Sequence, residues 1–191
     1  MTKIAAIFSL LLLMFFSLTS VVDANKEMSL EMEGKQITSS AAIKYDLAFP
    51  GILPDHPLYK LKVLRDRVST SLISDPQKKI NFYLLQADKG ILAAAMLIDK
   101  NKIELAKETT LKAENNMTLL TYGLGNLPNK ANDSLFARLK TASLKHQEVL
   151  KSILNRVPEK DKKQLQTVID FSKRNWKTIE DFQKSIGLPQ K

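Results

Sequence analysis

The chain has 191 residues, a formal net charge of +9, 44% hydrophobic residues and no cysteine. Without cysteine, a disulfide framework, a thiolate metal site and a cysteine nucleophile are all excluded. The length suits one domain with a substantial hydrophobic core, so we expect packing alone to stabilise it.

Residues 1–24 have the layout of a secretory signal. Lys3 precedes an apolar run from Ile4 to Leu18, and the more polar stretch that follows ends in the small residue Ala24. A basic flank, an apolar centre and a small residue before the cleavage point are the parts of a signal peptide. A retained membrane anchor is the alternative, because the apolar span approaches the roughly 20 residues that cross a bilayer. Both interpretations predict an extracytoplasmic protein, secreted or bound to the envelope.

Residues 25–44 have neither a helical nor a strand period and are expected to form a flexible leader. After them, Tyr45, Leu47 and Phe49 alternate with polar or small residues. This alternation predicts a short extended strap that lays three apolar side chains on one surface.

Three prolines follow the strap within eight residues. Each fixes its own φ angle and favours an extended residue before it, so no helix is expected before about Asp55. Pro57 suits the first turn of a helix, and Asp55 or His56 could cap it. The residues expected to shape this segment are Pro50, Gly51, Pro54, Asp55, Pro57, Leu58 and Tyr59.

Helical periodicity fills the next part of the chain. Apolar residues at three- and four-residue steps predict a first helix over about residues 57–73. Ser74 and Gln77 can form a capping box for a second helix, which runs to about Ile98 with a four-three apolar spacing. A phase slip after Ile98 predicts a bend or tight turn before a third helix over about residues 103–122.

Two more helices complete the predicted domain of residues 45–187, and residues 188–191 are a tail. Gly123, Gly125 and Pro128 interrupt the pattern before a fourth helix that ends near Val157. Pro158 opens the last helix, which closes near residue 187. The sequence therefore predicts an all-α fold, an antiparallel bundle of four or five helices preceded by a proline-rich strap.

The positive charge is uneven. Residues 129–191 hold 14 Lys and Arg against 7 Asp and Glu, whereas residues 25–128 hold 14 against 12. Such an excess can attract an anionic envelope polymer or a membrane surface, although solvated lysines on helices are the commoner explanation. Nucleic acid is an unlikely partner, because arginine and aromatic residues are not interleaved on one surface.

Two adjoining segments carry a resemblance to a known family. They are FPGILPDHPLYKLKVLRDRV at residues 49–68 and SDPQKKINFYLLQADKGILAAAMLIDKNKIELA at residues 74–106. Both are similar to a bacterial family of unknown function, numbered 5667, over about residues 45–120, and the proline segment is the specific part. Gly90 stands where the family pattern has an arginine. The resemblance implies an extracytoplasmic helical module and brings no established activity.

Candidate sites are few. Lys62, Arg65, Asp66 and Arg67 could form a fork that binds an acidic group, but Asp66 could equally pair with Lys62 at helical spacing. His146 occupies an apolar stripe, where a hydrogen-bonded interior histidine is the usual occupant.

We therefore expect no cofactor and no enzymatic activity, and predict a binding or scaffold module whose partner is a protein or an anionic envelope component. The alternative is a metal-dependent stress sensor or enzyme in which carboxylates and His146 converge inside the bundle.

Overall fold

The computed structural model describes residues 42–127 and 133–187, and this part of the chain contains helices and no strand. The predicted all-α fold is therefore confirmed. The signal or anchor over residues 1–24, most of the leader and the tail over residues 188–191 lie outside the described residues. The elements are α2 (Tyr59–Leu72), α3 (Pro76–Asp99), α4 (Ile103–Gly123), the 3₁₀ turn η1 (Leu124–Asn126), α5 (Asp133–Leu154) and α6 (Glu159–Ser185).

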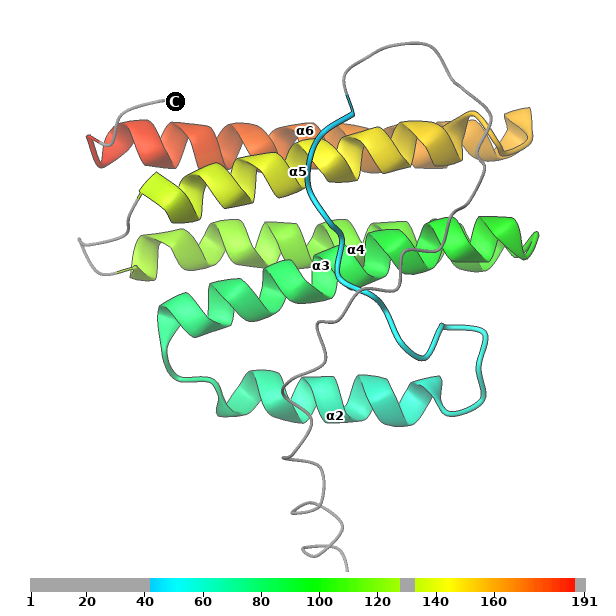
Figure 1. Cartoon of the computed structure of the whole chain (residues 1–191), viewed down its shortest axis with the longest axis horizontal. Coiled ribbons are helices and arrows are strands. Elements are labelled where there is room, and N and C mark those ends of the chain that lie inside the picture. Colours follow the sequence, from blue (N-terminus) through cyan, green and yellow to red (C-terminus); the bar gives the residue numbers. More distant parts are fainter. Residues whose placement is uncertain (1–41, 128–132, 188–191) are drawn as a thin grey trace, which may run out of the picture. The chain divides into compact units, whose positions relative to one another are not determined.

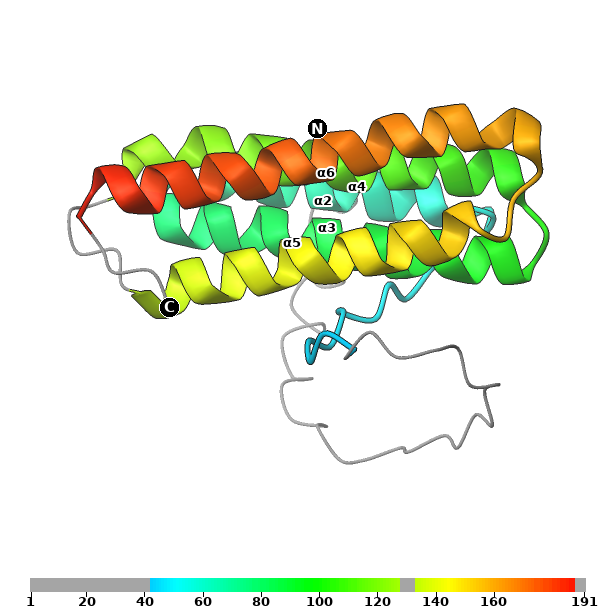
Figure 2. The same ribbon diagram turned by 90° about the horizontal axis from the view of Figure 1, so that it is seen from above.

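Four helices form the bundle. The hairpin of α3 and α4 packs against the hairpin of α5 and α6, with α4 beside α6 and α3 beside α5 (Figures 1 and 2). The α2 helix lies outside this bundle, next to the α3–α4 hairpin (Figure 1). The predicted hairpin of the last two helices is confirmed, and the turn between α3 and α4 is tight, with Asn101 at a positive φ of 56°.

The strap crosses the bundle before α2 begins (Figure 1). The backbone N–H of Ile43 donates to Glu148 of α5 at 2.9 Å, and Tyr45 and Leu47 pack against the core. The expectation for Phe49 is wrong, because its side chain is 69% exposed. Pro50, directly after it, is buried instead, and Leu53 is the next buried residue along the chain.

The proline segment joins the strap to the corner between α3 and α4. Asp55 accepts hydrogen bonds at 3.0 Å from both Lys100 and Lys102, so its role is to anchor the corner and not to cap α2. The α2 helix begins at Tyr59, two residues later than expected, and its N-cap residue Leu58 makes no side-chain cap hydrogen bond. His56, the other expected cap, accepts the backbone N–H of Leu58 through Nδ1 at 3.1 Å, just before the first helical residue. Gly51 takes a φ of 65°, the left-handed conformation that glycine adopts without strain.

The start of α3 differs from the expected capping box. Asp75 is the N-cap, and its carboxylate accepts the backbone N–H of Lys78 at 2.7 Å, ahead of Pro76 in the first turn. Aspartate caps a helix as well as serine does, and its charge also suits the positive end of the helix dipole.

The α3 seam is buried as predicted. Its core members are Ile80, Leu84, Ala87, Ile91, Ala94 and Ile98. The apolar stripe of α2, in contrast, is not buried, because none of that helix's residues is buried. Its large apolar side chains point to solvent, since the other face of α2 is turned toward the bundle.

Gly90 sets the spacing between α3 and α4. A Cβ atom at this position would lie 2.7 Å from the Cβ of Ala113, closer than real Cβ contacts. A larger side chain at this position, such as arginine, would need the two helices to separate. Glycine at position 90 therefore allows this close packing.

Replacing Gly90 with alanine should lower the free energy of unfolding by about 1–2 kcal/mol. Overpacking costs about 1–3 kcal/mol, and the better helix propensity of alanine offsets at most about 1 kcal/mol of that. Urea denaturation measures the change. Gly125→Ala is the matched control, because nothing lies within 4 Å of its new Cβ. A Gly90→Ala variant as stable as this control would contradict the packing argument, and Ala113→Gly should partly rescue it.

Candidate functional site

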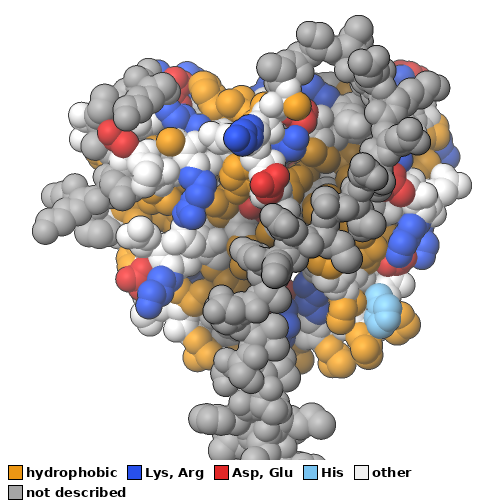
Figure 3. Space-filling view, viewed as in Figure 1, with side chains coloured by type: hydrophobic (Ala, Val, Ile, Leu, Met, Phe, Trp, Pro, Cys, Tyr) orange, Lys and Arg blue, Asp and Glu red, His pale blue; other side chains and the backbone are white. Residues whose placement is uncertain are grey.

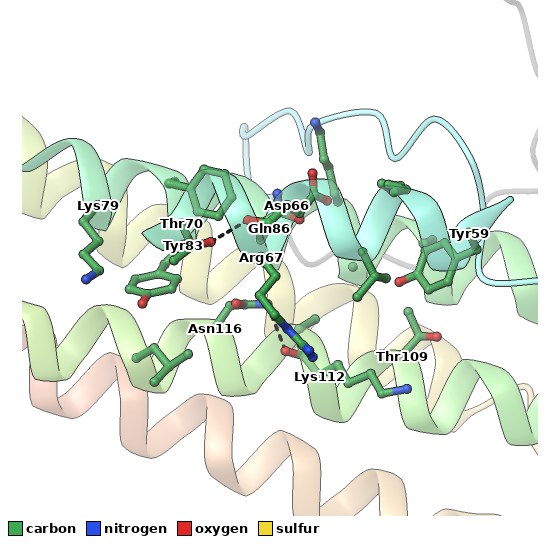
Figure 4. A pocket seen from close by; sticks show the side chains of 18 of the residues that line it. Tyr59, Asp66, Arg67, Thr70, Lys79, Tyr83, Gln86, Thr109, Lys112 and Asn116 are labelled. Carbon is green, nitrogen blue, oxygen red and sulfur yellow. Dashed lines mark hydrogen bonds between the residues drawn. The ribbon is translucent and has the colours of Figure 1, made fainter. Parts of the chain in front are cut away.

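A pocket of about 530 Å³ lies between α2 and the α3–α4 hairpin (Figure 4). The inner face of α2 forms one wall through Tyr59, Lys62 and Thr70. Residues of α3 and α4, among them Tyr83 and Asn116, form the other wall. The pocket exists because α2 turns its polar face to the bundle and stands off from it.

Positive charge dominates the lining of this pocket. Its five cationic side chains face a single carboxylate, that of Asp66. Three helices contribute the cations, which are Lys62 and Arg67 of α2, Lys79 and Lys89 of α3, and Lys112 of α4. Figure 4 shows Arg67 extending from α2 toward α4, where Lys112 lies. Together these side chains, with Asp66, are called the basic pocket below.

Most of these cations are not neutralised by the protein. Within the described residues, Arg67, Lys79 and Lys89 take part in no hydrogen bond or ion pair of their side chains. Lys112 pairs with Glu108 at 3.3 Å, but both side chains are well exposed, and such a pair contributes little. Unpaired cations around a concave surface are available to an anionic ligand.

Lys62 is a partly buried member of the basic pocket that also contacts the strap. Its ammonium donates to the carbonyl oxygens of Pro50 at 2.7 Å and Ile52 at 3.2 Å, which ties α2 to the strap. Burial lowers the pKa of Lys62, and the positive charges of Lys89 and Arg65 lower it further against the opposing effect of Asp66. Desolvation of the ammonium is thus the main cause of the lowered pKa, and the neighbouring cations add to it.

The structure brings together three of the four residues that the sequence singled out for binding. Lys62, Asp66 and Arg67 line the basic pocket, whereas Arg65 does not. Arg65 instead pairs with Asp66 at 2.8 Å, so the expected alternative of an Asp66–Lys62 pair is not the one formed.

The other three cations escaped the sequence reasoning because they come from different helices. The sequence feature that could have revealed two of them is a second, polar stripe on α3. It consists of Lys79, Tyr83, Gln86 and Lys89, which recur at steps of four, three and three residues beside the apolar seam. A polar stripe next to a buried seam marks the edge of a helix that borders a cleft. Only the fold shows that it meets Lys112.

A second polar cluster lies at the centre of the bundle. His146 of α5 is fully buried, and its Nε2 lies 2.8 Å from the carboxylate of Asp88 of α3. Its Nδ1 lies 3.3 Å from Glu114 of α4, a contact between charges without hydrogen-bond alignment. Tyr45 donates to Asp88 at 2.7 Å, and the amide of Asn175 in α6 donates to Glu114 at 3.1 Å. This buried network links the strap to all four bundle helices.

The network keeps His146 charged. Burial opposes the imidazolium most strongly, but the contacts with Asp88 and Glu114 and the charges of both carboxylates outweigh it and raise the pKa of His146 to about 9. The interior hydrogen-bonded histidine predicted from the sequence is thus confirmed. Each ring nitrogen faces its own carboxylate, so the three groups lie in line, and within residues 42–127 and 133–187 no cluster of three such side chains could hold a metal ion.

Asp88 and Glu114 were missed as network members by the sequence reasoning. Each stands inside an apolar seam, Asp88 between Leu84 and Ile91 and Glu114 next to Ala113. A carboxylate at a seam position is the signal, because an ionised group is almost never fully buried without a partner.

Comparison with known proteins assigns the chain to a family. The model of a family described as Domain of unknown function (DUF5667) matches residues 51–160, more than half of the chain. The chain belongs to the DUF5667 family. The match reaches further along the chain than the resemblance noted in the sequence, and it contains every residue that lines the basic pocket of this DUF5667 domain. No curated protein and no solved structure matches the chain.

Two members of the buried network, Tyr45 and Asn175, lie outside the part that matches the DUF5667 model. The family region therefore supplies the carboxylates and the histidine, and the strap and α6 supply the neutral groups that complete the network. Among the described helices of this DUF5667 protein, none combines the length and the apolar character that a membrane span requires.

Proposed function

We propose that this DUF5667 protein is an extracytoplasmic, non-enzymatic binding module that holds a phosphate-bearing ligand in the basic pocket. The observation that carries the proposal is the set of five cations from three helices around one carboxylate. Phosphate oxygens accept charge-assisted hydrogen bonds from arginine and lysine, and several cations can surround one such group. The signal-like residues 1–24 support a location outside the cytoplasm.

The basic pocket fits this role better than the positively charged C-terminal hairpin. On α5 and α6, most lysines pair with a carboxylate three or four residues away, as Lys145 does with Glu148 and Lys173 with Asp170. The opposite charges in such pairs largely cancel each other, so these lysines do not produce a concentrated positive potential. In the basic pocket the cations converge across a cavity from separate helices.

The sensor or enzyme alternative has less support. It needs His146 and carboxylates to present free ligand atoms to a metal, but Asp88 and Glu114 already occupy the two ring nitrogens. The network also accounts for the charge of these groups without any further partner. The geometry therefore favours a structural role for His146.

Calorimetric titration of the full chain with inorganic tripolyphosphate tests the proposal. Binding should weaken about tenfold or more in Arg67→Gln and in Lys79→Gln, because a hydrogen bond to a charged group contributes about 1.5–3 kcal/mol. Affinity should also fall as salt is added, since the cations are accessible to solvent.

Lys163→Gln is the matched control. Lys163 is an exposed lysine of α6, away from the basic pocket, and its side chain makes no ion pair within the described residues. This variant should bind tripolyphosphate as the unmodified chain does. Equal losses in all three variants would show that only the net charge matters, and absent binding in the unmodified chain would refute the proposal.

A further inference from the structure

The outer face of α2 carries an apolar stripe that nothing in the described structure covers. It comprises Leu61, Leu64, Val68 and Leu72, whose exposed fractions are 63%, 57%, 48% and 76%. At 100° per residue these positions fall on one side of the helix, opposite the side that lines the basic pocket. Figure 3 shows hydrophobic side chains gathered at the lower edge of the molecule, where Figure 1 places α2.

Single exposed apolar residues are ordinary, but a stripe of four along one helix is not. The α2 helix has only 14 residues, none of them buried, and no side chain caps its first turn. A helix this short is marginal in water without tertiary packing. A partner on the apolar stripe would supply the tertiary packing that the bundle does not provide to this face of the helix.

The charges of α2 indicate the nature of that partner. The helix has four basic side chains and one acidic side chain. Lys60 follows one edge of the stripe, and Arg65 follows the other. Arg65 pairs with Asp66 at 2.8 Å but stays well exposed, and neither cation lines the basic pocket. Apolar residues flanked by Lys and Arg are the pattern of helices that lie in the interface of an anionic membrane.

A second copy of the chain fits the stripe less well. Two α2 helices packed face to face would bring the basic edges of both copies together, with only Asp66 on each to offset them. Like charges held close destabilise an interface, whereas anionic headgroups neutralise them. Charge complementarity therefore favours lipid over self-association.

We propose that α2 lies on the surface of a membrane containing anionic lipid, with the stripe of Leu61, Leu64, Val68 and Leu72 inserted at the level of the headgroups. The opposite face of the helix stays toward the basic pocket. This inference does not depend on the proposed ligand, because the stripe, Lys60 and Arg65 are separate from the pocket lining.

A local reporter in the full chain tests this placement. The apolar run at residues 4–18 could itself bind lipid, so bulk sedimentation would be ambiguous. The chain has no cysteine, so Leu64→Cys creates a unique site for an environment-sensitive fluorophore. With vesicles of equal parts phosphatidylglycerol and phosphatidylcholine, its emission should shift to the blue and be quenched by nitroxide-labelled lipid.

The matched control is a label at Leu144→Cys, since Leu144 is an exposed leucine of α5, on a different helix. Its emission should not change with vesicles. Adding Lys60→Gln and Arg65→Gln to the labelled Leu64→Cys chain should raise the lipid concentration needed for half of the emission shift about 25-fold. The reason is that each cation near an anionic surface contributes roughly fivefold to the affinity.

Three results would overturn the inference. The first is an unchanged emission at position 64 with anionic vesicles, and the second is an equal response with pure phosphatidylcholine. The third is a blue-shifted emission at position 64 without vesicles. If that emission depends on protein concentration, a second copy occupies the stripe, and if it does not, another segment of the same chain does.

Discussion

Replacing His146 with leucine should reduce the free energy of unfolding by about 3–5 kcal/mol, the loss expected when one partner of a buried charge cluster is removed. Leucine fills a similar volume but leaves the carboxylates of Asp88 and Glu114 buried without the positive charge between them. Tyr45 would still donate one hydrogen bond to Asp88, and Asn175 one to Glu114. These neutral donors do not replace the positive charge of the imidazolium. Urea denaturation at neutral pH measures the loss.

A second variant distinguishes the destabilisation due to unpaired buried charges from the destabilisation due to lost packing. Adding Asp88→Asn and Glu114→Gln to His146→Leu removes both buried charges, and this triple variant should recover at least half of the loss. Ser152→Ala, at an exposed position of the same helix, should stay within about 0.5 kcal/mol of the unmodified chain. A His146→Leu variant as stable as Ser152→Ala would contradict the assigned role of the network.

The stability of the protein should fall as the pH rises from about 6.5 to about 9. The folded pKa of His146 is about 9, above the ordinary value of 6.5 that applies to the unfolded chain. A raised pKa means that the folded state binds the proton more tightly, so the contribution is complete below 6.5 and is lost as the pH passes through 9. The difference corresponds to about 3 kcal/mol.

Urea midpoints measured across this pH range test the prediction, and His146→Leu provides the control because it has no imidazole to titrate. The neighbouring Tyr45 should not interfere, since burial and its hydrogen bond to Asp88 raise its pKa well above the range. A proton resonance of the His146 ring should report the same transition directly. Parallel pH profiles for the unmodified chain and His146→Leu would disprove the coupling.

The sequence predicted the bundle well because its helices have strong periodic signals. The α3 seam, the proline at the start of that helix and the turn at Asn101 follow from local rules, and the structure agrees with all three. The α2 helix shows the limit of such rules. A periodic stripe predicts that a helix has an apolar face, but it does not determine whether this face meets the core or the surroundings.

The candidate sites were less predictable, because they are assembled from separate helices. Lys62, Asp66 and Arg67 are neighbours on one helix, so the sequence could group them. The contribution of Lys112 depends on how α4 lies beside α2 and α3, which no local pattern encodes. The same holds for Glu114 and its distance from His146.

The basic pocket shares its lining with a tightly packed contact, and this has an evolutionary consequence. Gly90 and Ala113 line the pocket and are constrained by the close packing of α3 against α4. The cations Arg67, Lys79 and Lys89 make no ion pair within the described residues, and substitutions at such positions usually change stability by less than about 0.5 kcal/mol. Ligand preference can therefore drift one cationic side chain at a time while the packed contact beneath is inherited intact.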